Sequence, residues 1–261
     1  MTALRGIIFD VDGILVASPH ERAWQESLRD LVATKWGSVG SYRPERFTTA
    51  VYQEHLAGKP RLSGARAALD FFHIPDAAGQ RALEYAQEKQ RRLEQLIDLG
   101  EFHAFPDALR FAQAFRARGF RLGVASSSKN ANALLARIRL DASVQDTKSP
   151  QSPAAVLLDI FDANVCGRDV PRGKPDPMIF CLAAEELGLP PDTCLVVEDA
   201  AVGIQAAKAG GMPALGVARL GDEALLHAAG ADLVVTTLDE VPIDALVSGR
   251  WLDTPAAGEH Q

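Results

Sequence analysis

The chain has 261 residues, of which 47% are hydrophobic and 23% are charged. This composition is typical of a globular protein with a sizeable core, and the length suits one large domain or a core with a smaller inserted domain. The formal net charge of −7 argues against nucleic acid and anionic membrane surfaces as partners. We find neither a signal peptide nor the roughly 20 apolar residues of a membrane span, so we expect a cytoplasmic protein.

The first predicted element is a short strand, Ile7–Phe9, which runs directly into Asp10 and Asp12. Two carboxylates, one residue apart at the tip of a buried strand, are costly unless a cation or a shared proton offsets their charge. This strand end is therefore a candidate site.

The segment from His20 to about Leu99 shows helical spacing of apolar residues and no convincing strand. Prolines separate four predicted helices, Glu21–Trp36, Glu45–Leu56, Ser63–Phe72 and Ala77–Ile97. An all-helical block after the first strand of a sheet is typical of a lid, so we predict a helical cap domain over residues 17–99.

Beyond residue 99, short apolar strands alternate with amphipathic helices. The predicted strands are Arg121–Ala125, Ala163–Cys166, Leu195–Val197, Ala214–Val217 and Leu233–Val235, and the predicted helices are 107–118, 130–139, 177–187 and 200–209. This alternation implies an α/β fold, a doubly wound, Rossmann-like and mainly parallel sheet with helices on both faces. Residues 1–16 and 100–249 would form this core domain. Residues 141–155 are predicted as a loop and 250–261 as a flexible tail.

Polar residues stand where several of these strands end, and ligands of open parallel sheets bind at that edge. The residues are Asp10 and Asp12 after the first strand, SSSKN (126–130) after the second, Glu198 and Asp199 after the fourth, and Lys174 before the helix 177–187. Carboxylates suit Mg²⁺, which commonly also contacts substrate phosphate. Hydroxyls, a helix start and a lysine suit the phosphate itself. The sequence therefore predicts a Mg²⁺-assisted site for a phosphorylated substrate.

Four segments are similar, in order and spacing, to the motifs of the haloacid dehalogenase superfamily: FDVDG (9–13), VASSSKN (124–130), GKPDP (173–177) and VVEDAAVGIQAAKAGG (196–211). Within it the chain most resembles the β-phosphoglucomutase-like branch, whose helical cap follows the first motif. The resemblance covers nearly the whole chain and implies a Mg²⁺-dependent enzyme acting on a small phosphorylated metabolite, a sugar phosphate. We expect a monomer or a weak homo-oligomer.

The resemblance implies roles for the motif residues. Asp10 would attack phosphorus and form an aspartyl phosphate, and Asp12 would be the general acid and base. Mg²⁺ would be held by Asp10, the backbone carbonyl of Asp12 and Asp199, with Glu198 close by. Lys174 would neutralise charge between nucleophile and phosphate.

The remaining predicted site residues bind phosphate or belong to the cap. HERAW (20–24) resembles the cap-entry segment that carries a catalytic histidine, here His20. The cap loop LAGKPRLSGARAAL (56–69) would supply Arg61 to the distal phosphate, and YAQEKQRR (85–92) would supply Lys89. In SSSKN, Ser126 would hold the transferring phosphate. The other phosphate-binding residues would be Ser127, Ser128, Lys129 and Asn130, the last three near the non-transferring phosphate.

Each cap residue also has a plainer interpretation. A lone histidine at a helix start commonly faces solvent, an arginine in a turn commonly lies on the surface, and Lys89 lies in a charge-dense helix whose default is a solvated face. The family usually has an aspartate where Ala17 stands and two more residues before the histidine. This shortened hinge puts the placement of His20 in question. The stretch 141–159 is also longer than usual.

Two functions stay open on this pattern. The first is a phosphosugar mutase that moves phosphate between the 1- and 6-positions of a hexose through a bisphosphate. The alternative is a phosphatase on the same machinery, in which water accepts the phosphoryl group. Arg61, Lys89 and SSSKN favour the mutase because a second phosphate needs its own cations, whereas the short hinge leaves room for the phosphatase.

Overall fold

A six-stranded parallel sheet forms the centre of the computed structural model, which describes residues 3–37, 39, 42–140 and 155–248. Its strand order is β5-β4-β1-β6-β7-β8, with bounds Ala163–Asn164, Arg121–Val124, Gly6–Phe9, Cys194–Glu198, Ala214–Val217 and Leu233–Val235. All six strands were predicted, and the doubly wound α/β class is confirmed. The predicted tail 250–261 and most of the loop 141–155 lie outside the described residues.

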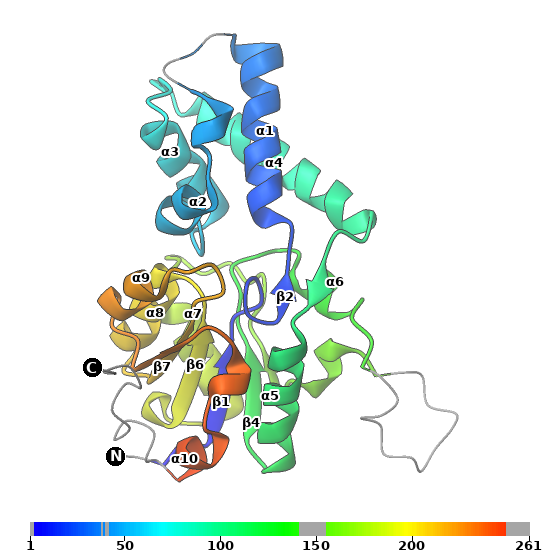
Figure 1. Cartoon of the computed structure of the whole chain (residues 1–261), viewed down its shortest axis with the longest axis vertical. Helices are drawn as coiled ribbons and strands as arrows, with labels where there is room; N and C mark the ends of the chain where they lie inside the picture. Colours follow the sequence, from blue (N-terminus) through cyan, green and yellow to red (C-terminus); the bar gives the residue numbers. More distant parts are fainter. Residues whose placement is uncertain (1–2, 38, 40–41, 141–154, 249–261) are drawn as a thin grey trace, which may run out of the picture.

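Helices cover both faces of this sheet (Figure 1). One face packs against α5, α6 and α10, which span Pro106–Ala117, Ala131–Leu135 and Ile243–Val247. The other packs against α7, α8 and α9, which span Met178–Leu187, Ala201–Ala209 and Glu223–Ala228. Because Ile7 and Phe9 enter one core and Ile8 the other, the strand is apolar at every position.

The register of the sheet brings the polar strand ends together. Phe9 lies opposite Val124 on one side and Val197 on the other. Asp10, the serine-rich segment after Val124, and Glu198 therefore emerge at the same edge. This edge is the one predicted to carry the site.

The helices α1 to α4 form a separate layer beyond that edge (Figure 1). They span His20–Leu31, Thr49–His55, Arg61–Phe71 and Gln80–Asp98, with a π-helical turn at Val32–Trp36 and a 3-10 turn at Pro44–Arg46. They share their own apolar cluster, which includes Trp24, Leu28, Leu69, Phe72 and Tyr85. Among the described residues from 20 to 98 there is no strand, as predicted.

A two-stranded antiparallel ribbon, absent from our expectations, joins the two layers. In it β2 (Val16–Ala17) pairs with β3 (His103–Ala104), so both connections between the helical layer and the sheet run side by side. The predicted domain boundary at residue 17 falls inside β2. Strands of two residues are too short to leave a periodic pattern in the sequence.

The helix predicted at 130–139 was too long, since α6 ends at Leu135. After it, the chain pairs with the segment before the 3-10 turn Leu157–Ile160. Leu140 N–H donates to the Ala155 carbonyl at 2.9 Å, and Leu157 N–H donates to the Ile138 carbonyl at 2.8 Å. These backbone bonds replace the last helical turn.

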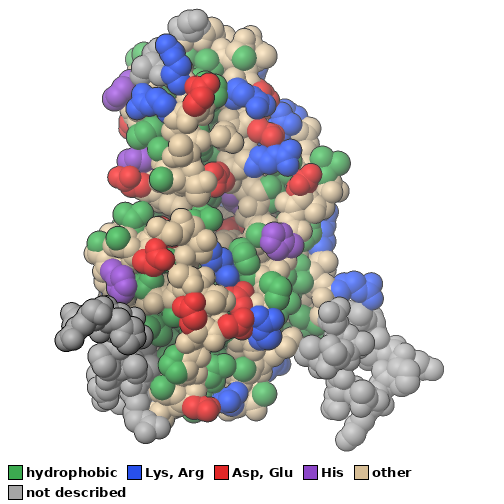
Figure 2. Space-filling model, viewed as in Figure 1, with side chains coloured by type: hydrophobic (Ala, Val, Ile, Leu, Met, Phe, Trp, Pro, Cys, Tyr) green, Lys and Arg blue, Asp and Glu red, His purple; other side chains and the backbone are tan. Residues whose placement is uncertain are grey.

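No helix among the described residues is long and apolar enough to cross a membrane. On the face in Figure 2, acidic and basic side chains are interspersed over the upper, helical part of the molecule. The helical layer also contains the ion pairs Arg22–Glu26 and Lys35–Glu84.

Candidate active site

A cavity of about 610 Å³ separates the helical layer from the carboxyl edge of the sheet. Both layers contribute side chains to its wall. From the sheet side come Asp10, Asp12, Ser126, Ser127, Ser128, Lys129, Lys174, Glu198, Asp199 and Arg219, and from the helical side come His20, Trp24, Tyr52, Gln53, Lys59, Arg61 and Lys89. Most of the site residues predicted from sequence therefore lie around one space.

Lys174 links two carboxylates at the floor of this cavity. Its Nζ lies 2.6 Å from Asp10 Oδ1 and 2.5 Å from Glu198 Oε1, and the residue is only 4% exposed. Burial alone would lower the pKa of Lys174, but the attraction of both carboxylates outweighs it and raises the pKa above its ordinary value. The ammonium therefore stays charged throughout the neutral range.

The acids nevertheless outnumber the lysine. Burial raises the pKa of Asp10 to about 7, although Lys174 opposes the shift. Burial and the repulsion of Glu198 and Asp10 raise the pKa of Asp199 well above its ordinary value. Gly13 packs so closely that a Cβ there would lie 1.9 Å from Asp199 Oδ2. This edge of the sheet is short of positive charge.

Glu198 is fully buried and already bonded through both oxygens. Besides its Oε1 contact with Lys174, its Oε2 accepts the Ala200 N–H at 2.8 Å. Among the four acids predicted as metal ligands, Glu198 therefore already has a protein partner for each of its two oxygens.

The remaining donors fit a hard cation. No three His, Cys, Asp or Glu side chains of the described residues gather as a complete metal site. The mixed set of oxygens expected from the sequence, the carboxylates of Asp10 and Asp199 and the carbonyl of Asp12, stays a prediction. Asp12 Oδ1 is buried without a hydrogen-bond partner in the described chain, and the excess of negative charge favours a divalent ion.

His20, the first residue of α1, reaches Asp12 despite the shortened hinge. Its Nδ1 lies 2.8 Å from Lys89 Nζ, and its Nε2 lies 3.5 Å from Asp12 Oδ1 and 3.4 Å from Ser128 Oγ. Burial lowers the pKa of His20 to about 4, so the ring is neutral at pH 7. The solvent-facing interpretation of this histidine is wrong.

Lys89 is likewise inside the protein rather than on a solvated face. It is 3% exposed, and its Nζ lies 5.0 Å from the centroid of the Trp24 ring. Burial lowers the pKa of Lys89 to about 7. Arg61, the first residue of α3, lies half-buried on the same wall, and burial lowers its pKa below the ordinary value.

The serines of the segment 126–128 differ in their hydrogen bonds. Ser126 is 2% exposed, and its Oγ accepts the Ser128 N–H at 3.1 Å. Ser127 Oγ is buried without a hydrogen-bond partner among the described residues. Ser126 and Ser127 both line the same cavity as Asp10.

Lys129 and Asn130 lie less favourably for the predicted second phosphate. Lys129 Nζ donates to the Gly167 carbonyl at 2.7 Å and to Asp169 Oδ1 at 2.5 Å. Asn130 does not line the cavity, and its Oδ1 accepts from Gln90 of α4 at 3.2 Å. Both side chains already have protein partners that the sequence did not indicate.

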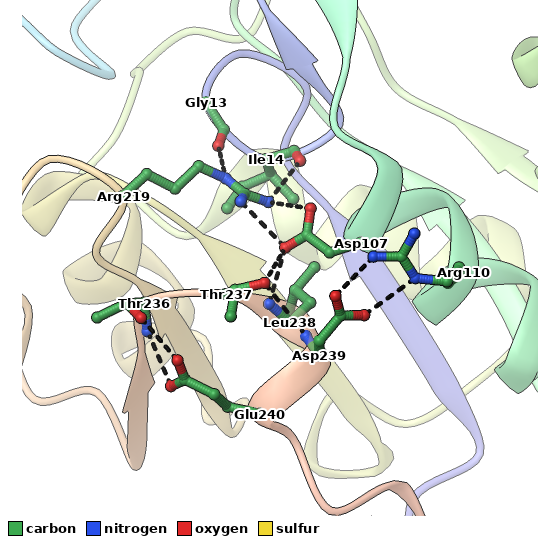
Figure 3. Close-up of polar contacts among 10 residues, drawn as sticks. All are labelled: Gly13, Ile14, Asp107, Arg110, Arg219, Thr236, Thr237, Leu238, Asp239 and Glu240. Atoms are coloured by element: carbon green, nitrogen blue, oxygen red, sulfur yellow. Dashed lines mark hydrogen bonds and ion pairs between the residues drawn. The ribbon is translucent and has the colours of Figure 1, made fainter.

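Arg219 is a site residue that sequence reasoning missed, and Figure 3 shows its contacts. Its Nε donates to the Gly13 carbonyl at 3.0 Å, while Nη1 and Nη2 reach the Asp107 carboxylate at 3.0 and 3.1 Å. Asp107 also accepts from Thr237 Oγ1 and the Leu238 N–H, both at 2.8 Å. Burial alone would raise the pKa of Asp107, but these hydrogen bonds lower it, so the pair is ionised.

This network fixes the loop that follows Asp12. Arg219 stands two residues after β7, so the same strand-end rule that selected the other residues would have found it. Tyr52 and Gln53 of α2 were also missed, because nothing in their sequence context distinguishes them from other helix residues.

The fold and the site together define the class of the protein. The arrangement is that of an enzyme. A doubly wound sheet holds a lysine between two buried carboxylates at its carboxyl edge, and a helical layer with further cations covers that edge. The sequence profile of the haloacid dehalogenase-like hydrolases matches residues 4–211, and the chain belongs to this family, in its β-phosphoglucomutase-like branch.

Individual relatives agree with this assignment. The chain is 31% identical to a β-phosphoglucomutase of Mycobacterium bovis over 252 residues, 91% of each chain. It is 32% identical to a fructose-1-phosphate phosphatase of Escherichia coli over 215 residues, 81% of this chain and 95% of that one. An archaeal β-phosphoglucomutase structure from Pyrococcus matches with a TM-score of 0.69 at 30% identity, over 94% of this chain and 99% of that one.

We predict that Arg219→Met lowers both stability and turnover. The substitution leaves the buried Asp107 carboxylate without its cation, which costs about 3 kcal/mol of unfolding free energy, and frees the Gly13 loop. Arg110→Met is the matched control, because Arg110 pairs with exposed Asp239 and contributes little. Thermal melts and kcat for a phosphate ester measure both effects. Wild-type values for Arg219→Met would contradict the proposed support of the loop.

Proposed function

We propose that this enzyme is a Mg²⁺-dependent phosphosugar mutase of the β-phosphoglucomutase type. The observation that carries the proposal is that one cavity has cationic side chains on both of its walls. Lys174 lies beside Asp10 on the sheet side, which Ser126 also lines, and Arg61 and Lys89 lie on the helical side, so phosphate could be bound at both walls. A bisphosphate intermediate with a phosphate at each end matches such a cavity.

In this proposal Asp10 is the nucleophile. Its Oδ atom forms a bond to phosphorus while the bond from phosphorus to the sugar oxygen breaks, which leaves an aspartyl phosphate. Lys174, 2.6 Å away, stabilises the ionised carboxylate and the charge of the phosphoryl oxygens. The Ser126 hydroxyl and neighbouring backbone N–H groups orient those oxygens.

Asp12 moves the proton. It protonates the leaving sugar oxygen and later takes a proton from the hydroxyl that attacks the aspartyl phosphate. Because a charged Lys89 can only donate, His20 accepts at Nδ1 and carries its proton on Nε2, which faces Asp12. His20 therefore positions the Asp12 carboxylate.

Asp10, Asp199 and the Asp12 carbonyl would hold Mg²⁺. The ion supplies positive charge between the nucleophile and the phosphate. We further propose that residues 17–99 act as a cap whose closure excludes water, which otherwise hydrolyses the aspartyl phosphate.

A phosphatase is the second candidate function, and a specific observation favours it. Lys129 is bonded to Asp169 and Gly167, and Asn130 is bonded to Gln90, so two residues expected at the non-transferring phosphate are engaged elsewhere. With a weaker second phosphate site, water becomes the acceptor of the phosphoryl group. The phosphatase relative from Escherichia coli fits this alternative.

One assay separates the two functions. The enzyme is incubated with β-glucose 1-phosphate, Mg²⁺ and a catalytic amount of the hexose bisphosphate, and glucose 6-phosphate and inorganic phosphate are followed together. The mutase proposal predicts isomerised product with little free phosphate. Rapid phosphate release without isomerised product would establish the phosphatase instead.

Lys89 gives the affinity for phosphate a pH dependence. Its pKa is about 7 in the free protein, and a bound phosphate favours the charged form, so binding above pH 7 requires proton uptake. We predict that KM rises by up to about tenfold per pH unit above 7. Because the unfolded chain keeps this lysine protonated to about pH 10, the free energy of unfolding also rises with pH over this interval.

Measurements of KM from pH 6.5 to 9 test this dependence, with Lys89→Met as the comparison. The variant has no ammonium group at residue 89. Its KM is therefore higher than that of wild type and shows no pH dependence from the titration of this residue. A wild-type KM that does not change above pH 7 would contradict the role of Lys89.

A further inference from the structure

Buried polar atoms without a partner gather at the cavity. Seven such side-chain atoms occur in the described chain, and four belong to cavity residues, namely Asp12 Oδ1, Gln53 Oε1, Ser127 Oγ and Asp222 Oδ1. Asp12 and Ser127 already have places in the proposed chemistry. Gln53 is the one on the helical side.

Gln53 lies on α2 and is 9% exposed. Neither end of its amide makes a hydrogen bond with the described residues, and its Oε1 is buried. Two other part-buried glutamines of the helical layer do have partners, since Gln25 donates to the Phe47 carbonyl at 3.0 Å and Gln90 donates to Glu94 at 2.6 Å. Leaving a buried amide oxygen unpaired costs stability, so Gln53 is exceptional among these glutamines.

The neighbouring residue shows which part of the cavity α2 faces. Tyr52 also lines it, and burial together with the nearby charges of Asp199 and Asp12 raises the pKa of its hydroxyl well above the ordinary value. Tyr52 and Gln53, consecutive residues of α2, therefore both line the cavity that the acids also line.

The chemistry of the amide selects its ligand. A phosphate offers only acceptors and is best bound by cations, such as Arg61 and Lys89 on the same wall. An uncharged amide both donates and accepts, and so does an alcohol hydroxyl. We propose that Gln53 binds a hydroxyl group on the carbon skeleton of the phosphorylated substrate, and that it makes the cavity select substrates with that hydroxyl. This inference rests on the proposed function.

The selectivity follows from the cost of an unmade hydrogen bond. When the hydroxyl is missing, the buried amide stays unpaired in the complex, and sites of this kind discriminate strongly. We expect wild-type kcat/KM to fall roughly 100-fold for the analogue that lacks the recognised hydroxyl.

The experiment crosses variants with substrate analogues. Gln53→Leu removes the amide at similar size, and Gln95→Leu on α4 is the matched control, because Gln95 is exposed and does not line the cavity. Each protein is assayed with the best hexose 1-phosphate and with its three monodeoxy analogues that lack the hydroxyl at position 2, 3 or 4. Thermal melts without ligand accompany the kinetics.

We expect the effects of the substitution and of the missing hydroxyl on kcat/KM not to add. On the parent substrate, kcat/KM of Gln53→Leu is roughly 100-fold below that of wild type. On the one analogue that lacks the recognised hydroxyl, kcat/KM of the variant falls by less than about a further threefold. Its melting temperature equals or exceeds that of wild type, since an unpaired polar group has been replaced by an apolar one. Gln95→Leu behaves as wild type throughout.

Three results would overturn the inference. One is wild-type kinetics in Gln53→Leu, which means that the amide meets only water. The second is an equal loss on the parent and on every analogue with a lower melting temperature, which indicates a structural role. Both leave the proposed function intact, because wild type still turns over the parent. The third is a wild type that ignores every hexose phosphate while hydrolysing a hydroxyl-free ester such as acetyl phosphate, which would remove the proposed function as well.

Discussion

The ion pairs of Lys174 with Asp10 and Glu198 are the interaction on which the site depends. Parallel pairing in register places Asp10 and Glu198 at adjacent strand ends, where neither residue is more than 6% exposed. Burial raises the pKa of Asp10 to about 7, and the attraction of Lys174 opposes that rise. Glu198 accepts a hydrogen bond from the Lys174 ammonium through Oε1 and one from the Ala200 N–H through Oε2, which holds Lys174 beside Asp10. The proposed nucleophile is thus positioned by the same contacts that make its burial tolerable.

The helical layer also buries polar side chains in the opposite wall of the cavity, but their charges and hydrogen-bonding atoms are less well compensated. Lys89 is buried beside the neutral His20, so its charge is only partly compensated and its pKa falls to about 7. The buried Oε1 of Gln53 has no hydrogen-bond partner among the described residues. These groups lower the stability of the free protein, and a phosphorylated, hydroxyl-bearing ligand would satisfy them. Stability and specificity are therefore opposed in this layer, whereas they coincide around Lys174.

The parts of the molecule that could be predicted are those with a strong local signal. The six strands are continuous apolar runs because both faces are covered, and Asp10, Ser126, Lys174 and Asp199 follow from their places at the sheet edge. The ribbon β2–β3 and the early end of α6 depend on long-range backbone pairing, which leaves no pattern. The engagement of Lys129 by Asp169, and the isolation of Gln53, are set by tertiary neighbours and could not be predicted from spacing.

The central claim is that phosphoryl transfer passes through Asp10. The most direct measurement is rapid acid quenching during turnover, followed by reduction with tritiated borohydride and peptide mapping, with Asp10→Asn as the control. The reduction releases the phosphate and converts an aspartyl phosphate to tritium-labelled homoserine. We predict that this label maps to residue 10 in wild type and is absent from a folded, inactive Asp10→Asn protein. Label on another residue, or continued turnover by Asp10→Asn, would contradict it.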